Sequence, residues 1–508
     1  MTRPNILFIT SDQQRADCLG IAGRRIKTPH LDQLARDGTR FTNAITPCVI
    51  CQPARASILT GQLPRTHGVH DNGIDLDPDL GGKGFAGTLA GDGYDTAYFG
   101  KAHFSTYHTF EPTGTPECVK SSANYDESWY GPYMGFEHVE LMLVGHNWFL
   151  PEEPPRGQHY ERWLFADGRG HEKNAAYLEN ARNTNGAAQT HHSKLPVAWH
   201  NSTWTADRAI NWLNRRDEDA DPFCAWVSFP DPHHPFDAPE PWSYLHAPED
   251  VDLPEHRTRD FSNRPWWHEA VLTAQPAGAE EHANIRKQYS RIPEQSDVQL
   301  REIIANTYGQ IALIDHQVGR LMATLDELGL RENTIVVYSS DHGDWLGDHG
   351  LILKGPMHYD GLLKVPLLMR GPGIAAGETN DNPVSTLDLA STFTDYAGTT
   401  PQLTQHGNSL RPVLEDGAKR DYARNEWGLL PTRAGVELAL QTVRTCNAKL
   451  TKDMISGAGE MYDLENDPHE MINLYDDPTH AGLRATLEAM IDERPDDMVP
   501  LREQVGMA

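Results

Sequence analysis

Short apolar segments that read as buried strands alternate along this chain with amphipathic segments that read as helices. Strand patterns are expected at residues 5–10, 94–99, 223–229, 334–339 and 365–369. Helix patterns are expected at 29–37, 203–214, 297–328 and 386–396. Alternation of this kind favours a mixed, mostly parallel sheet sandwiched by helices, because strands covered on both faces carry continuous apolar runs. The chain is therefore predicted to be an α/β protein.

The alternation breaks down in two regions. Residues from about 104 to 200 are rich in Pro, Gly, His and aromatic side chains, and we interpret them as a long insertion that serves as a substrate-side lid or a subunit contact. After residue 400 the pattern turns to short alternating segments. We therefore expect a catalytic domain over residues 1–400 and a smaller α+β subdomain with an antiparallel sheet over residues 401–508.

Composition and charge narrow the class of protein. The net charge of −28 argues against nucleic acids and heavily sulfated polymers as partners, since a negative surface repels them. No run of eighteen apolar residues exists, so no membrane span is expected. The apolar segment at residues 5–10 is too short for a signal-peptide core, which predicts a cytoplasmic protein. Six cysteines in 508 residues do not suggest a disulfide framework.

Residues 51–61 contain a C-x-P-x-R unit made of Cys51, Pro53 and Arg55. Pro53 suits the first turn of a helix and Gly61 its end. A helix N-terminus with an arginine one turn in is suited to hold an anion. Two other interpretations stay open: Cys48 and Cys51 form a C-x-x-C that is typical of redox or zinc sites, and a cysteine at a helix start is often simply buried.

Acidic and amide side chains follow two of the predicted strands. Asp12 and Gln13 come after residues 5–10, and Asp341 and His342 come after residues 334–339. Groups beyond the carboxyl ends of parallel strands meet at one edge of the sheet. Two carboxylates, an amide oxygen and an imidazole would bind a divalent cation. The alternative is that each Asp only caps a turn, as an isolated Asp at a strand end usually does.

Cationic side chains follow other strands. Lys101 and His103 come after residues 94–99, His233 comes after 223–229, and Lys354 lies beyond Asp341. A single lysine is usually just solvated. Four such groups placed after sheet strands indicate a cationic pocket for a tetrahedral anion.

These motifs, taken in order, resemble those of the type I sulfatases of the alkaline phosphatase superfamily, and the resemblance runs from about Pro4 to Leu474. The motifs are Ser-Asp-Gln-Gln-Arg, Cys-x-Pro-x-Arg-Ala-Ser-x-Leu-Thr-Gly, Gly-Lys-x-His, Pro-His-x-Pro-Phe, Asp-His-Gly-Asp and Met-Tyr-Asp-Leu-Glu-Asn-Asp-Pro. The resemblance implies an alkaline-phosphatase-like fold. It also implies that Cys51 is oxidised after synthesis to formylglycine by a separate maturation enzyme.

The resemblance implies a role for each site residue. The implied ligands of one divalent metal are Asp12, Gln13, Cys51 after its conversion, Asp341 and His342. Arg55 would steady the formylglycine. The groups that would contact the sulfuryl oxygens or the leaving group are Lys101, His103, His233 and Lys354.

The family chemistry suits these residue types. A hydroxyl of the hydrated aldehyde attacks sulfur in line, with Asp341 placed to take its proton. His233 or Lys354 protonates the departing alcohol oxygen. A base, taken here as His103, then removes the second hydroxyl proton so that the sulfated hemiacetal collapses and expels sulfate. Loss of Cys51 is therefore expected to abolish turnover.

The chain departs from most calcium sulfatases, which carry paired acidic residues at the first strand and Asn or Gln beside the later Asp. Here the pairs are Asp12-Gln13 and Asp341-His342, so manganese is as plausible as calcium. This pattern resembles the branch that holds choline sulfatases, certain arylsulfatases and phosphonate monoester hydrolases. The Gly-Lys-x-His unit with Lys101 and His103 favours sulfate esters, with phosphonate or phosphate esters as side activities.

The leading hypothesis is therefore a sulfatase for small aryl or alkyl sulfate monoesters. The first alternative is a phosphonate monoester hydrolase or phosphodiesterase on the same scaffold, and the second is a noncatalytic binding protein. We also expect a homo-oligomer, either a dimer or a tetramer. Aromatic residues of the insertion could form a box for a quaternary ammonium group such as choline, or could equally be core residues. They include Trp129, Tyr130, Trp148, Tyr160 and Trp163.

Overall fold

The computed structural model describes residues 3–143, 157–217, 219–277 and 291–507. Its main element is an eight-stranded sheet with the strand order β5-β4-β6-β1-β7-β8-β2-β9. The five strands β5, β4, β6, β1 and β7 are parallel to one another. β8 is antiparallel to both β7 and β2, and β9 is parallel to β2. Their bounds are β1 Asn5–Ser11, β2 Thr39–Phe41, β4 Asp95–Lys101, β5 His138–Met142, β6 Phe223–Ser228, β7 Thr334–Ser340, β8 Leu367–Arg370 and β9 Glu378–Asn380.

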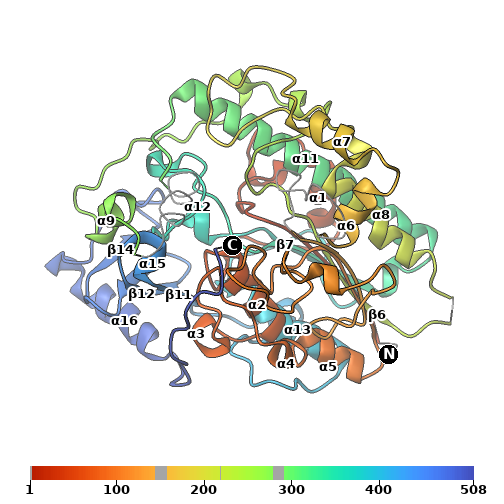
Figure 1. Ribbon diagram of the computed structural model, residues 1–508. Helices are drawn as coiled ribbons and strands as arrows, with labels where there is room; N and C mark the ends of the chain where they lie inside the picture. The colour runs from red at the N-terminus through yellow and green to blue at the C-terminus, as the bar shows by residue number, and fades with distance from the viewer. Residues whose placement is uncertain (1–2, 144–156, 218, 278–290, 508) are drawn as a thin grey trace.

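Helices cover both faces of this sheet (Figure 1). Because side chains alternate along a strand, Ile6 and Phe8 of β1 face one layer and Leu7 and Ile9 the other. The first layer holds α2, α5 and α13, and the second holds α1, α8 and α11. Their bounds are α1 Pro29–Arg36, α2 Cys51–Thr60, α5 Phe85–Gly91, α8 Asn201–Leu213, α11 Asp297–Glu327 and α13 Asp388–Ala397. The predicted sandwich of helices around a mostly parallel sheet is confirmed.

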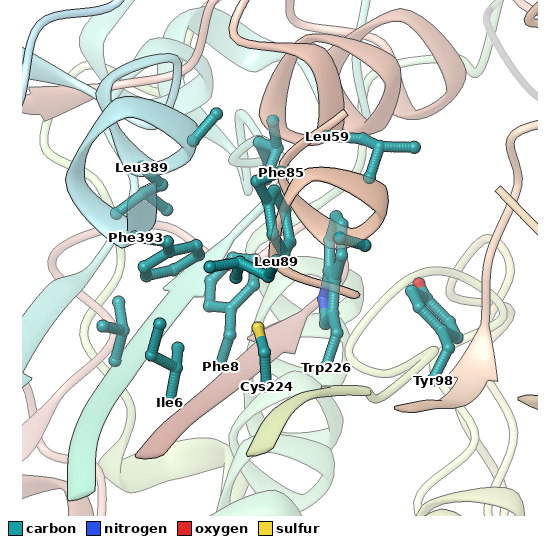
Figure 2. Packing of buried hydrophobic residues seen from close by; sticks show 14 of the residues in the cluster. Ile6, Phe8, Leu59, Phe85, Leu89, Tyr98, Cys224, Trp226, Leu389 and Phe393 are labelled. Atoms are coloured by element: carbon teal, nitrogen blue, oxygen red, sulfur yellow. The ribbon is translucent and has the colours of Figure 1, made fainter. Parts of the chain in front are cut away.

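The layer that contains α2 has an aromatic core. Figure 2 shows Phe8, Phe85, Trp226 and Phe393 packed together between the sheet and the helices. The ring centroids of Phe8 and Trp226 lie 4.7 Å apart, and those of Phe85 and Phe393 lie 5.1 Å apart. The Trp226 indole also donates a 2.8 Å hydrogen bond to the Thr10 hydroxyl. This core fixes α2, and with it residue 51, against the centre of the sheet.

The five predicted strands and four predicted helices all form, with small shifts at their ends. One start was wrong: α13 begins at Asp388 rather than at 386, because Ser385 belongs to a short strand, β10 (Val384–Ser385), paired with β3 (Ala44–Ile45). The Asp388 carboxylate accepts the Ser385 N–H at 2.9 Å, which is one of the two hydrogen bonds of a capping box.

The segment 104–200 is more regular than its composition suggested. It contributes β5, the edge strand of the main sheet, and two helices. These are α6 (His159–Phe165) and α7 (Gly170–Leu178). β5 was missed because His138 and Glu140 interrupt its apolar pattern, as an edge strand allows. Residues 144–156 of this expected insertion, with Trp148, lie outside the described residues.

The C-terminal part of the chain forms a separate four-stranded antiparallel sheet in the order β11-β12-β13-β14. Helix α16 (Ala481–Asp492) packs on it through Leu487 and Ile491. The strands are β11 Ala423–Leu429, β12 Leu438–Arg444, β13 Ala448–Asp453 and β14 Gly459–Asp463. The shorter helices of the chain are α3 Pro64–His67, α4 Pro78–Gly81, α9 Trp267–Thr273, α12 Asp360–Leu363, α14 Arg411–Glu415 and α15 Pro431–Ala434.

After α16 the chain returns to loops that precede and follow the strand β4 of the eight-stranded sheet, and the label C in Figure 1 marks its end. The Val499 N–H donates to the Arg65 carbonyl and the Val505 N–H to the Gly73 carbonyl, both at 2.7 Å. The Val505 carbonyl accepts the Phe110 N–H at 2.9 Å. This C-terminal tail, residues 499–507, thus joins two loops that lie far apart in sequence. Of the helices that the structure describes, none has the length and apolar character needed to span a membrane.

Candidate active site

The parallel register of the two central strands brings the predicted acidic residues together. β1 and β7 pair so that Ser11 lies beside Ser340, which places Asp12 and Asp341 side by side just beyond the strand ends. Both side chains are buried, at 0% and 1% exposure. The Gln13 N–H donates to Asp341 Oδ1 at 3.1 Å and so ties the two strand ends together.

Arg55 neutralises both carboxylates from the first turn of α2. Its Nη2 lies 3.0 Å from Asp12 Oδ2, and its Nε lies 2.9 Å from Asp341 Oδ2. Lys101 at the end of β4 adds a third ion, with its Nζ 2.6 Å from Asp12 Oδ2. Burial raises the pKa of Asp12, but Lys101 and Arg55 outweigh burial and hold this pKa well below its ordinary value. The Asp12 carboxylate is therefore held ionised by fixed cations.

The opposite side of the carboxylates faces Cys51 and His342. Ligand atoms of Asp12, Cys51, Asp341 and His342 all lie within 4.8 Å of one another. His342 Nδ1 lies 2.8 Å from the Gly343 carbonyl, which can only accept, so Nδ1 carries a proton and Nε2 is the nitrogen that faces the carboxylates. Nε2 lies 3.9 Å from both Asp12 Oδ1 and Asp341 Oδ1. Two carboxylate oxygens and an imidazole nitrogen fixed through its other nitrogen fit a divalent metal.

Gln13, the other predicted metal ligand, has a strained backbone conformation. Its backbone φ is +67°, a value that non-glycine residues rarely adopt. The side-chain amide donates to Asp344 Oδ2 at 2.6 Å, and the amide oxygen is buried without a hydrogen-bond partner in the described structure. An unsatisfied buried carbonyl is a ready ligand atom. Asp344 also accepts the Leu346 and Leu353 N–H groups at 2.7 and 2.8 Å, and so anchors the loop that leads to Lys354.

Lys354 connects the two predicted halves of the site. Its ammonium lies 2.8 Å from Cys51 Sγ, 2.9 Å from His233 Nε2 and 3.1 Å from His342 Nε2. An ammonium has three donors, and these three acceptors match that number. His233 Nδ1 lies 2.6 Å from the His234 carbonyl and therefore carries a proton, so His233 Nε2 is the acceptor toward Lys354.

Cys51 is the first residue of α2 and is 1% exposed. Burial raises the pKa of its thiol and Asp12 adds to this, yet Lys354, His342 and Lys101 bring the net pKa below its ordinary value. Cys48 differs: it is packed in an apolar cluster with Trp345 and Trp427, and burial raises its thiol pKa well above the ordinary value. Both cysteines are free thiols. Their environments disfavour the redox interpretation of the C-x-x-C.

His103 follows Lys101 in a left-handed turn, with φ at +54°. Its ring stacks on Tyr107 with 4.5 Å between centroids, and neither ring nitrogen has a hydrogen-bond partner among the described residues. Burial lowers the pKa of His103 well below its ordinary value, and the nearby Lys101 and Arg55 lower it further. The ring is therefore neutral and able to accept a proton.

Sequence reasoning missed Glu117, which holds this turn. The Glu117 carboxylate is completely buried and accepts the backbone N–H groups of His103, Phe104 and Ser105, the last two at 3.0 Å. It also accepts the Tyr133 hydroxyl at 2.8 Å. Burial raises the pKa of Glu117 to about 7, although these hydrogen bonds lower it. Glu117 lies in the segment 104–200, and no local pattern in the sequence links it to His103.

The aromatic residues that the structure describes in segment 104–200 include a group that lies away from the predicted site residues. Tyr130, His159 and Trp163 line a separate cavity of about 640 Å³, which none of the predicted site residues lines. Tyr160 and Trp129 pack in or against hydrophobic clusters of the core. Tyr160 therefore belongs to the core, Trp129 and Trp163 are half-buried, and Tyr130 is exposed, while Trp148 lies outside the described residues.

Comparison with known proteins gives two family matches. The profile of the family described as "Sulfatase" matches residues 4–399. A second profile, described as N-sulphoglucosamine sulphohydrolase, C-terminal, matches residues 347–497. Together the two matches span both sheets of the structure.

Individual relatives match along nearly their whole length. An arylsulfatase from Clostridium perfringens is 29% identical over 495 residues, which cover 93% of this chain and 90% of the relative. A multifunctional alkaline phosphatase superfamily protein, PehA, from Trinickia caryophylli is also 29% identical, and the match covers 95% of this chain and 93% of the relative. Among solved structures, a phosphonate monoester hydrolase of Agrobacterium radiobacter has a TM-score of 0.74 at 26% identity. The match covers 98% of this chain and 96% of that structure's chain.

Proposed function

We propose that this chain, a member of the sulfatase family and a sulfuric ester hydrolase, acts on small aryl or alkyl sulfate monoesters through a formylglycine derived from Cys51. The observation that carries the proposal is the position of the Cys51 sulfur. It lies between a carboxylate and imidazole set suited to a metal and the ammonium of Lys354. Sulfate esters are anions, and this one buried atom is surrounded by the cations that such a substrate requires.

Two groups would complete this site. The residues that would hold a divalent cation, Ca²⁺ or Mn²⁺, are Asp12, Gln13, Asp341, His342 and residue 51. Bound there, the cation would supply positive charge that favours the ionised hydroxyl of the hydrated aldehyde at residue 51. The formylglycine would supply the hydroxyl nucleophile toward sulfur, and it requires a maturation enzyme.

The remaining residues would bind the sulfuryl group and orient it. Lys101, Lys354 and the N-terminus of α2 would face its oxygens, and Arg55 would keep residue 51 in place through the ion pairs to Asp12 and Asp341. These donors and charges are already fixed by hydrogen bonds before substrate arrives. Fixed charges of this kind stabilise a transition state more than mobile ones do, because they need no reorganisation during the reaction.

Proton transfer would divide between the two ends of the pocket. At one end the Lys354 ammonium is hydrogen-bonded to His233 Nε2 at 2.9 Å, so a proton can pass to His233 and from there to the departing alcohol oxygen. At the other end the neutral ring of His103 can take the proton of the second hydroxyl at residue 51. The lowered pKa of His103 keeps it available as a base at neutral pH.

A phosphonate monoester hydrolase is the second candidate, and one observation favours it. The solved phosphonate monoester hydrolase of Agrobacterium radiobacter covers 98% of this chain at 26% identity. We place sulfate esters first because the Gly-Lys-x-His residues Lys101 and His103 lie in the pocket region, and we expect phosphonate and phosphate esters as side activities. We further propose a cytoplasmic homo-oligomer, a dimer or tetramer.

The test compares 4-nitrophenyl sulfate with 4-nitrophenyl phenylphosphonate on the same metal-loaded, converted enzyme. The two esters share a leaving group, so the ratio of their kcat/KM values reports only the preference for the transferred group. We expect the higher kcat/KM for the sulfate. A higher value for the phosphonate would replace the leading function by the second candidate.

A further inference from the structure

A cavity of about 550 Å³ lies beside the candidate active site and is lined by none of its residues. Its walls come from the loop after β1, from the β2 and β8 strands, and from segments near residues 252–256, 348–349 and 468–470. The volume is that of a pocket for a small organic molecule. Part of the wall is apolar, from Leu19, Phe41, Leu367 and Leu368.

The charges that line this cavity do not cancel. Asp17 lies 2.9 Å from Arg15 and 2.7 Å from Arg24, and Asp348 lies 2.7 Å from Arg15. Three of the remaining acids form ion pairs with cations that do not line the cavity: Asp360 with Arg444, Glu470 with Lys449, and Asp252 with Arg25. The last acid, Glu255, is exposed.

Two cations remain without a carboxylate partner among the described residues. Lys364 is half-buried and forms no ion pair there; burial lowers the pKa of its ammonium, and the attraction of Asp360 and Asp17 offsets only part of this. Arg40 is also half-buried; its Nη1 reaches only the Ile21 carbonyl at 3.4 Å, and its Nε is buried without a hydrogen-bond partner. A buried cation without an anion is costly, and the cost disappears when an anion binds.

Position brings these two cations to the same wall. Arg40 of β2 lies opposite Leu368 of β8, and Lys364 is four residues before Leu368 on the same segment. Lys354, the proposed sulfuryl contact, shows a similar feature, because no described carboxylate forms an ion pair with it either. In a chain with a net charge of −28, uncompensated cations inside a concave surface are exceptional and point to an anion.

We propose that this cavity is a second ligand site, separate from the active site, that binds a small organic anion. Its acidic group, a sulfonate, sulfate or carboxylate, lies between Arg40 and Lys364, and its apolar body packs against Leu19 and Phe41. Arg15 contacts the Asp344 and Trp345 carbonyls at 3.2 and 2.8 Å, so the cavity wall is continuous with the loop that leads to Lys354.

The test uses 1-naphthalenesulfonate, an aryl sulfonate that a sulfuric ester hydrolase cannot cleave because its sulfur is bound to carbon. Titration calorimetry is done on full-length Lys354→Gln protein, which weakens binding at the active site and leaves the cavity intact. We expect one molecule to bind per chain. Adding Arg40→Gln and Lys364→Gln raises Kd by about tenfold or more, because both charge-assisted contacts are lost.

A steric variant and a charge control accompany this test. Ala22→Phe fills the cavity without changing its charge, and it is expected to raise the Kd of 1-naphthalenesulfonate to a similar degree. Arg25→Gln removes a cation that is 70% exposed beside the cavity and leaves Kd unchanged. No binding to the Lys354→Gln protein overturns the proposal, and so does an unchanged Kd in the Arg40→Gln, Lys364→Gln protein. Hydrolysis of sulfate esters does not enter these readouts.

Discussion

At the scale of single residues, the proposed route of protons to the leaving group depends on Lys354. Its ammonium donates to Cys51 Sγ, His233 Nε2 and His342 Nε2 within 3.1 Å. His233 is half-buried, whereas Cys51, His342 and Lys354 are buried, so His233 is the member of this group that is partly exposed. A proton relayed from Lys354 through His233 leaves the lysine neutral until it is protonated again.

His233→Ala is expected to slow hydrolysis according to the leaving group. Esters of poor leaving groups need protonation in the transition state and should lose about 10²- to 10⁴-fold in kcat/KM. Esters of good leaving groups, such as 4-nitrophenol, should lose much less. The measurement is kcat/KM across a series of substituted phenyl sulfates. His234→Ala, which removes the neighbouring imidazole, is the matched control. Its loss in kcat/KM should depend only weakly on the leaving group. Equal losses across the series for His233→Ala would remove His233 from the acid role.

Glu117→Gln is expected to disturb His103 without touching substrate. An amide can accept through one atom only, so one of the backbone N–H groups at residues 103–105 loses its acceptor. The expected loss in kcat is about 10- to 100-fold. Faster hydrogen exchange at the amides of residues 103–105 is the readout that does not depend on activity. Glu111→Gln, an exposed glutamate of the same segment, is the control.

The same variant gives a prediction about pH. The Glu117 carboxylate is the form that accepts three N–H groups, and its pKa is raised to about 7. As pH falls through 7 the group protonates, loses acceptor capacity and loosens the His103 turn. Wild-type kcat should therefore decline on the acid side with an apparent pKa near 7, and this decline should be absent in Glu117→Gln. The same acid decline in both proteins would contradict the role given to Glu117.

The position of a site residue in the fold decides whether the sequence alone could reveal it. Asp12, Lys101, His233 and Asp341 each follow a strand that is recognisable from its apolar run, so their shared edge could be predicted. Asp344 and Glu117 act through backbone N–H groups that lie close only after folding. No periodicity in the sequence encodes such a contact.

At the scale of elements, the C-terminal tail contacts the loop of Asn72 and Gly73, and this loop is hydrogen-bonded to the start of α2. The tail bonds to the Gly73 carbonyl, and the Gly73 N–H in turn donates to the Gln52 side chain at 2.9 Å. Gln52 is the neighbour of Cys51 and also donates its own N–H to Asn72 at 3.1 Å. The last residues of the chain are thus connected to the start of the catalytic helix by two hydrogen-bonded steps.

Val505→Pro tests this connection in the full-length chain. Proline removes the N–H that bonds to Gly73, so the free energy of unfolding should fall by about 1–3 kcal/mol. Amide exchange at residues 73 and 110 should become faster. Glu503→Pro is the matched control, because its side chain is exposed and no bond from its N–H is among those described. Equal destabilisation by the two prolines would show that the tail does not support this loop.

Element prediction succeeded where burial dictates sequence and failed where it does not. The central strands β1 and β7 are wholly buried and were placed within one or two residues of their ends. β5, an edge strand with His138 and Glu140, lacked that signal. The short strands β2, β9 and β10 contain two or three residues each, too few for any alternation to be recognised.

At the scale of the whole molecule, one sheet positions both the active site and the second cavity. β1 and β7 carry the metal-ligand candidates, and β2 and β8 on one side carry the cavity with Arg40 and Lys364. The α/β sandwich and the C-terminal antiparallel sheet were both expected from the order of segments. The antiparallel pairing of β8 with β7, and the position of β2 beyond β8, could not be predicted, because sequence order does not fix strand order.

The central claim is that turnover requires residue 51 as an aldehyde rather than a thiol. The protein is prepared with increasing amounts of a formylglycine-generating enzyme, and mass spectrometry of the peptide that contains residue 51 gives the converted fraction. We predict that kcat for 4-nitrophenyl sulfate, expressed per chain, rises in proportion to this fraction and falls to zero in unconverted protein and in Cys51→Ala. Full activity in protein whose residue 51 is entirely cysteine would contradict the account.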